Sequence, residues 1–270
     1  MVPRRQRRRR LAARSLEQSE RGIPRRRGNG IRSLKGPGTT HGSHHRTSRP
    51  SRNECGCGEL RILGVSGSLR KESFNTQLLT AVRLLAPAGM EIELFDGIGD
   101  LPLYNQDLDT REGSPAPVTR WRDAVREADG LIIVTPEYNS SIPGVVKNAV
   151  DWASRPLMNA ALHGKCVVTM VATPGRGLGR NALTDLGRVL HDCHAQVISG
   201  PWVVLTEAED KLVDVEDEQG RLVPTLCDPS AARLATVQLN ALAAAVDAGA
   251  GEHAVAPLRS YFAAGRARNS

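Results

Sequence analysis

The sequence lacks an apolar run long enough to cross a membrane, and its cysteines follow no repeated spacing. No stretch approaches the roughly 18 apolar residues that a transmembrane helix requires, so we expect no membrane span. Five cysteines are an odd number, which argues against a disulfide framework. The first residues also lack the apolar segment of a secretory signal, although their Arg and Ser content leaves an organellar transit peptide open. We therefore expect a cytoplasmic protein.

The positive charge of the chain is confined to its N-terminal segment. Residues 1–59 contain 15 Arg and one Lys against four Glu, a net charge of +12, so the total of +7 leaves −5 for residues 60–270. With few apolar residues in periodic positions, residues 1–58 cannot offset the entropy of ordering, and we predict a disordered basic extension. Its Arg runs could bind nucleic acid or an acidic membrane. Because no aromatic residue accompanies them, we favour a solvated extension that binds neither.

The same segment contains residue types that can bind metal. Cysteines and histidines occur there as C-x-C and H-x-x-H-H, at Cys55, Cys57, His41, His44 and His45. A Gly- and Ser-rich context lacks the scaffold that fixes tetrahedral geometry, so we expect no metal site. We interpret Cys166, at the head of an apolar run, as a small core residue.

From residue 60 onward, short apolar runs alternate with segments of helical period. We expect strands at 61–66, 90–95, 131–135, 166–172 and 195–205, and helices at 76–85, 118–128, 145–154, 182–193 and 229–245. Repeated βα units predict an α/β fold, a flavodoxin-like doubly wound sheet of five parallel strands in the order 2-1-3-4-5. This domain covers residues 59–248.

Three details qualify this pattern. Pro201 should interrupt the fifth strand, since proline donates no hydrogen bond to a sheet. Residues 207–220 are acidic and polar and are interpreted as a surface excursion with a turn at Glu-Gln-Gly. Asp228 followed by Pro229 has the cap and first-turn chemistry of a helix start, and residues 249–270 are predicted to be a frayed C-terminal tail.

The loop after the first strand has the chemistry of a phosphate site. Hydroxyl, amide and guanidinium groups gather between a strand end and a helix start, at Ser66, Ser68, Arg70, Ser73, Asn75 and Thr76. Helix N-termini attract anions, Arg70 offers a bidentate fork, and Gly67 allows a close turn. Ser73 or Asn75 could instead merely cap the helix. Because neither polyphosphate nor dinucleotide glycine fingerprints are present, one terminal phosphate of a mononucleotide is favoured.

The loop after the third strand is rigid and suits a planar ring. Pro136 and Pro143 stiffen its two ends, and the main chain between them can address the polar edge of a ring. Glu137 could be a general acid, but no histidine or second carboxylate lies near it in sequence. Tyr138 could flank the ring or only pack. The strand-four loop adds glycines spaced GxGxG, at Gly175, Gly177 and Gly179, a pattern also typical of a flexible turn.

At this point the sequence resembles the NADPH-dependent FMN reductases, with their related quinone and chromate reductases. The resemblance is carried by GSLRKESFN at 67–75, LPLY at 101–104 and TPEYNSSIPGVVKNAVDW at 135–152, in order and at the expected βα junctions. It implies a flavodoxin-like subunit that binds FMN and works as a homodimer or homotetramer. The strand-four loop departs from the family pattern at 177–182, and the N-terminal extension has no counterpart.

The resemblance also implies roles for individual residues. The FMN phosphate would be held by Ser68, Arg70, Ser73, Asn75 and Thr76. The isoalloxazine ring would be held by Pro136, Glu137, Tyr138 and Asn139, with a further contact from Thr173. Tyr104 and Asn105, in the long loop before residue 118, resemble residues that approach the flavin of the partner subunit.

The expected activity is that of an FMN-dependent NAD(P)H oxidoreductase. NADPH or NADH would reduce the bound flavin and leave, and a quinone, free flavin or similar small acceptor would then take its place. The flavin performs the chemistry, so no protein nucleophile and no metal is required. Main-chain donors of residues 136–139 would stabilise the charge of reduced FMN. The alternatives are a flavodoxin-type electron carrier without NAD(P)H turnover and a nucleic-acid binder that uses the Arg-rich extension.

Overall fold

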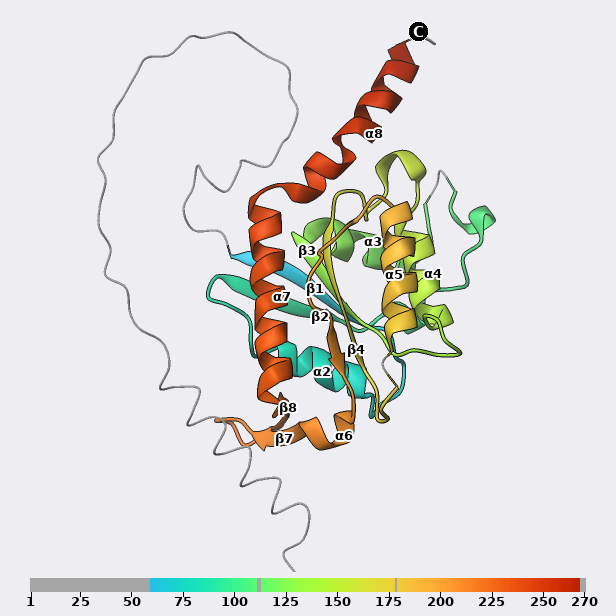
Figure 1. Cartoon of the computed structure of the whole chain (residues 1–270). Helices are drawn as coiled ribbons and strands as arrows, with labels where there is room; N and C mark the ends of the chain where they lie inside the picture. Colours follow the sequence, from blue (N-terminus) through green and yellow to red (C-terminus); the bar gives the residue numbers. More distant parts are fainter. Residues whose placement is uncertain (1–58, 111–112, 178, 268–270) are drawn as a thin grey trace, which may run out of the picture. The chain divides into compact units, whose positions relative to one another are not determined.

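The computed structural model describes residues 59–110, 113–177 and 179–267, where parallel strands alternate with helices (Figure 1). The strands of the main sheet are β1 (Leu60–Ser66), β2 (Met90–Phe95), β3 (Gly130–Val134), β4 (Cys166–Ala172), β5 (Gln196–Val197) and β6 (Val203–Leu205). The helices around it are α2 (Phe74–Arg83), α3 (Ala116–Glu127), α4 (Gly144–Ala153), α5 (Arg180–Asp192) and α7 (Pro229–Asp247). The predictions for residues 1–58, including the candidate metal ligands, lie outside the described residues.

The main sheet is parallel and has the predicted order, β2-β1-β3-β4-β5. Both β5 and β6 pair with β4, β5 near its start at Cys166 and β6 near its end at Ala172. Two short strands, β5 and β6, therefore occupy the place in the sheet that was expected for a single fifth strand. The break contains Pro201, which has no N–H to continue the ladder, so the predicted interruption is confirmed.

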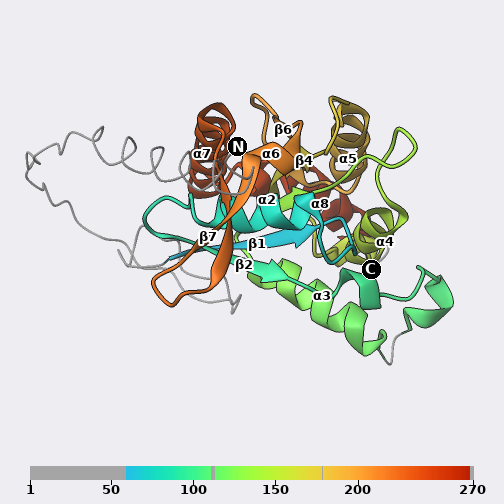
Figure 2. The ribbon, with the colours of Figure 1, turned by 90° about the horizontal axis from the view of Figure 1, so that it is seen from below.

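Helices cover both faces of the sheet and produce three layers. One core joins α2 and α7 to the sheet, and a second joins α3, α4 and α5 to the opposite face. Figure 2 shows α3 on the other side of β1 and β2 from α2 and α7. Every residue of β3 and β4 is buried, as strands covered on both faces require. The carboxyl ends of the strands are thus the open edge at which loops can form a site.

The acidic segment after β6 is more ordered than the sequence indicated. It forms the short helix α6 (Ala208–Lys211) and an antiparallel hairpin of β7 (Leu212–Glu216) and β8 (Leu222–Leu226), and β8 packs against α2. The predicted turn is present, with Gly220 at φ +72°. The alternation of apolar and acidic residues in LVDVE is a strand pattern that the acidic composition concealed.

The prediction of a frayed C-terminal tail is wrong. Residues 250–267 form helix α8 (Ala250–Ala267), which Figure 1 shows running away from the sheet beyond the end of α7. Val255 is buried, and Gly251 packs so closely on Gly164 that a Cβ there would overlap the Gly164 carbonyl oxygen. Alanine-rich sequence and this anchor stabilise the helix despite Pro257 within it. Among the described residues, no helix combines the length and the hydropathy needed to cross a bilayer.

Candidate functional site

The loops that follow β1 and β3 are joined to each other. The Gly67 N–H donates to the Val134 carbonyl oxygen at 2.8 Å, where the two strands end side by side. A Cβ on Gly67 would lie 2.7 Å from the Thr135 Oγ1 and 2.6 Å from a Val146 methyl carbon. Only glycine fits this approach, so Gly67 brings the first loop against the second.

Ser73 and Arg70 form the anion-binding part of the first loop. Ser73 is 3% exposed, and its hydroxyl oxygen accepts from the amides of Asn75 and Thr76, which confirms a cap at the start of α2. Accepting two bonds leaves its O–H free to donate, and no acceptor for that proton is found among the described residues. Arg70 lies 5.7 Å from the Phe74 ring centroid and donates to the Glu72 carbonyl oxygen, without a carboxylate partner in the described chain. Both groups can therefore bind an anion.

Asn75 connects the first loop to strand β4. Its Nδ2 donates to the Ala172 carbonyl oxygen at 3.0 Å, and its Oδ1 accepts from the Ala172 amide at 2.9 Å. The side chain is buried, so these bonds satisfy backbone groups at the end of β4 that have no other strand to pair with on that side. The Thr76 side chain points to strand β1 beneath the loop, and its Oγ1 lies 2.7 Å from the Ser66 Oγ. Both residues support the loop from beneath.

Replacing Asn75 by alanine should destabilise the fold. The change leaves the buried N–H and C=O of Ala172 without partners, which costs about 2 kcal/mol in the free energy of unfolding. Urea denaturation of the variant measures this loss. Asn240→Ala is the control, because the exposed Asn240 bonds only within α7 and its loss should change stability little. Equal stabilities of the two variants would contradict the connecting role of Asn75.

The loop after β3 contains a tight turn that displays Tyr138. The Tyr138 N–H donates to the Ser141 carbonyl oxygen and the Ser141 N–H to that of Tyr138, with Asn139 and Ser140 at φ +50° and +62°. Two successive positive φ values define a type I′ turn. The Ser141 hydroxyl also bonds the Asp185 carboxylate at 2.6 Å, which fixes the turn against α5. Tyr138 is half exposed at the surface of this rigid turn.

Glu137 caps helix α5 from outside that helix. Its carboxylate accepts from the backbone amides of Asn181 and Ala182 at 3.0 and 3.3 Å and from the Asn181 side chain. Gly179, at the N-cap position, has no side chain that could do this. A negative charge at a helix N-terminus is stabilised by the helix dipole. The carboxylate thus holds the second loop to α5, and this geometry gives no support to a general acid.

The three loops enclose one cavity of about 320 Å³ at the carboxyl ends of the strands. Of the ten residues predicted to hold FMN, all line it except Thr76 and Asn139, whereas Tyr104 and Asn105 lie outside the lining. The lining is Ser68, Arg70, Ser73, Phe74, Asn75, Pro136, Glu137, Tyr138, Ala172, Thr173, Pro174, Gly177 and Gly179. The sequence reasoning missed Phe74, which adjoins a predicted residue and lies beside Arg70. Of the three spaced glycines, Gly177 and Gly179 line the cavity, whereas the Gly175 carbonyl oxygen accepts from the Glu207 amide.

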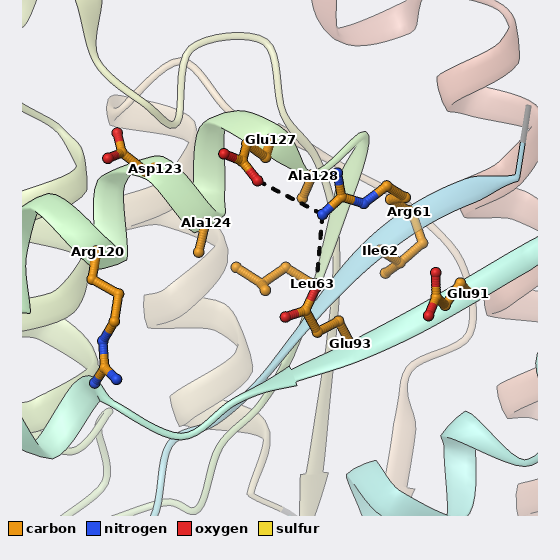
Figure 3. A pocket seen from close by; sticks show the side chains of 10 residues that line it. All are labelled: Arg61, Ile62, Leu63, Glu91, Glu93, Arg120, Asp123, Ala124, Glu127 and Ala128. Carbon is orange, nitrogen blue, oxygen red and sulfur yellow. Dashed lines mark ion pairs between the residues drawn. The ribbon is translucent and has the colours of Figure 1, made fainter.

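A second cavity, of about 360 Å³, lies between α3 and the strands β1 and β2 (Figure 3). Arg61 crosses it and pairs with Glu93 at 3.8 Å and with Glu127 at 3.7 Å. The cavity surrounds the first half of β1, away from the strand ends where ligands of such sheets bind. We therefore place the functional site at the smaller cavity.

Neither metal nor thiol chemistry is indicated within the described residues. They contain no group of three or more His, Cys, Asp or Glu side chains that could hold a metal ion. Burial raises the pKa of the thiols of Cys166, Cys193 and Cys227, which keeps them protonated and unreactive.

The fold and the cavity define a flavodoxin-like α/β protein with an anion-binding site at the switch point of its sheet, where the strand order reverses. The sequence model of the NADPH-dependent FMN reductases matches residues 60–210, and the chain belongs to that family.

Individual relatives agree with this membership. An NAD(P)H-dependent FMN reductase from Pseudomonas aeruginosa is 40% identical over 184 residues, which cover 68% of this chain and 94% of the relative. A quinone reductase from Escherichia coli is 41% identical over 143 residues, which cover 53% of this chain and 76% of that relative. Among solved structures, the flavoenzyme NAD(P)H:(acceptor) oxidoreductase FerB from Paracoccus denitrificans superposes with a TM-score of 0.60 at 30% identity, covering 70% of this chain and 98% of FerB.

Proposed function

We propose that the protein is an FMN-dependent NAD(P)H oxidoreductase that passes reducing equivalents from NADPH or NADH to a quinone, flavin or similar small acceptor. The observation that carries the proposal is the cavity at the switch point, with an unsatisfied hydroxyl of Ser73 and the guanidinium of Arg70 on one side. Family membership and the relatives support the same activity. Bound FMN would supply the two-electron redox chemistry that links the nicotinamide to the acceptor.

The residues present fit FMN. A terminal phosphate requires several donors and positive charge, which Ser68, Ser73 and Arg70 supply beside the N-terminus of α2. The rest of the cavity is bounded by Pro136, Tyr138 and Thr173, with room for a planar ring. Asn75 and Thr76 act indirectly, because their side chains bond to the protein beneath the loop.

The second loop supplies main-chain donors for the ring, but fewer than the sequence indicated. Pro136 has no N–H, and the Tyr138 N–H is used within the turn. The amides of Glu137 and Asn139 have no partner among the hydrogen bonds of the described residues. Of these two residues only Glu137 lines the cavity, so we assign its amide to the polar edge of the ring, where a fixed donor stabilises negative charge. The side chain of Glu137 contributes by holding this segment to α5.

Steady-state kinetics test the proposal. Purified protein supplied with FMN should oxidise NADPH or NADH with a quinone acceptor, and varying both substrates should give the parallel double-reciprocal lines of a ping-pong mechanism. Protein that takes up no FMN and oxidises neither nucleotide would contradict the activity. Protein that binds FMN without oxidising either nucleotide would indicate the flavodoxin-type carrier, and intersecting lines would contradict the ping-pong order alone.

Two further predictions accompany this function. A homodimer or homotetramer and a cytoplasmic location are inferred from the family resemblance and from the composition.

A further inference from the structure

We propose that Arg176 and Glu207 form the part of the site that selects between NADPH and NADH. The inference rests on the proposed function, since it concerns the nucleotide that supplies the electrons. The two nucleotides differ only at the 2′ position of the adenosine ribose, which bears a phosphate in NADPH and a hydroxyl in NADH. Arginine binds a 2′-phosphate, and a carboxylate accepts from the 2′-hydroxyl. The pair offers both kinds of group.

The pair lies at the rim of the cavity. Arg176 belongs to the loop whose Pro174, Gly177 and Gly179 line the cavity, and its side chain is 90% exposed. Its Nε donates to the Glu207 Oε1 at 2.9 Å, and the Glu207 amide donates to the Gly175 carbonyl oxygen at 3.0 Å. The Ala208 amide donates to the Thr173 carbonyl oxygen, so the start of α6 is fixed to this loop. Both charged groups are thus fixed to the segment whose neighbouring residues line the cavity, and both remain accessible.

The cavity accommodates part of the nucleotide, so the rest must lie outside it. At about 320 Å³ it is at the small end of ligand sites, so it cannot enclose a flavin and a whole dinucleotide together. With its nicotinamide inside the cavity, the nucleotide has to leave its adenosine half on the exposed rim. Arg70 is turned toward Glu72 and Phe74 in the first loop, whereas Arg176 projects from the rim. Arg176 is therefore a cation placed for a 2′-phosphate.

The stability of the fold does not explain this pair. An exposed ion pair contributes little to the stability of a fold. Glu207 has a φ of +52°, a left-handed conformation that is unfavourable for a glutamate. Strain of this kind occurs at ligand-binding sites. The backbone of Glu207 thus holds its carboxylate against Arg176 without a net gain for the fold.

Two substitutions should change the nucleotide preference in opposite directions. Arg176→Ala leaves the carboxylate of Glu207 to repel a 2′-phosphate, so kcat/KM for NADPH should fall about tenfold while that for NADH is retained. Glu207→Gln removes this repulsion and replaces the charged acceptor of the 2′-hydroxyl by a weaker, neutral amide oxygen, so the ratio of NADPH to NADH in kcat/KM should rise severalfold. If the pair had a merely structural role, its loss would lower kcat/KM for both nucleotides by the same factor. Arg188→Ala, which removes an exposed arginine paired with Asp192 on α5, should leave the ratio unchanged.

A binding measurement provides a readout that is independent of turnover. Calorimetric titration of FMN-loaded protein with 2′,5′-ADP, compared with 5′-AMP, isolates the 2′-phosphate. Wild-type protein should bind 2′,5′-ADP more tightly than 5′-AMP. Arg176→Ala should weaken the binding of 2′,5′-ADP about tenfold and leave the binding of 5′-AMP unchanged. Equal binding of the two probes by wild-type protein, or an unchanged preference in both variants, would overturn the inference. If the wild-type protein still oxidises NADPH or NADH, the proposed function survives that result.

Discussion

Replacing Gly67 by alanine should cost about 1–3 kcal/mol in the free energy of unfolding and remove most of the bound FMN. The added Cβ would lie 2.6–2.9 Å from atoms of Val146 and Thr135, neither of which is the far end of a flexible side chain. Relief of this overlap has to separate the first loop from the second, which also breaks the bond from the Gly67 amide to Val134. Phosphate-holding and ring-holding residues then no longer face the same cavity. Urea denaturation and the flavin content of purified protein measure the two effects.

Gly187→Ala is the matched control for this prediction. Gly187 lies within α5, and a Cβ there would meet nothing within 4 Å. Alanine in a helix interior should raise stability by about 0.5–1 kcal/mol, the opposite sign, and leave flavin content unchanged. A Gly67→Ala variant with wild-type stability and full flavin content would show that the two loops do not approach as closely as described.

Replacing Arg122 by alanine should cost about 3 kcal/mol, because it removes a buried guanidinium and leaves the carboxylate of Asp109, 15% exposed, without its cationic partner. Arg122 makes a bidentate pair with Asp109 at 2.7 and 2.8 Å and also donates to Ser114 and to the Trp152 carbonyl oxygen. These bonds attach the end of the long loop to α3 and α4. Arg120→Ala is the control, since Arg120 forms an exposed pair with Asp100 and should contribute less than about 1 kcal/mol. Similar losses in both variants would contradict the role of Arg122.

The Arg122–Asp109 pair also predicts how stability depends on pH. The hydrogen bond from Arg122 lowers the pKa of Asp109 from 3.8 to about 2. Because the folded-state pKa is depressed, the carboxylate contributes about 2 kcal/mol above pH 4, and the contribution is lost as the pH falls from about 4 to 2. The stability difference between wild-type protein and Asp109→Asn should therefore shrink over this interval. A difference independent of pH would contradict the depressed pKa.

Much of the fold could be predicted because its signals are local. Continuous apolar runs mark β3 and β4, and the Asp228–Pro229 start of α7 is confirmed by the bond that the Asp228 side chain accepts from the Ala231 amide. Proline chemistry predicted the break near Pro201. The hairpin and α8 were not predicted, because the first has an acidic composition and the second depends on the packing of Gly251 against Gly164, far away in sequence.

The position of the site could be predicted from the sequence, but only some of the contacts that its side chains make could be. A polar loop after a buried strand locates the cavity, because parallel strands end at one edge. The partners of its side chains depend on tertiary packing. Asn75 bonds to a strand 97 residues away, and Glu137 caps a helix that begins 43 residues later. No local pattern indicates that either polar group is satisfied by the protein.

The most direct test of the FMN site compares the binding of FMN with that of riboflavin, which differs by the phosphate alone. Flavin fluorescence titration of flavin-free protein measures both affinities, for the wild type and for Arg70→Ala. The account predicts that the wild type binds FMN at least about 100-fold more tightly than riboflavin, and that Arg70→Ala reduces this preference about tenfold or more while riboflavin binding is retained. Equal affinities for the two flavins, or an unchanged preference in Arg70→Ala, would contradict the phosphate site.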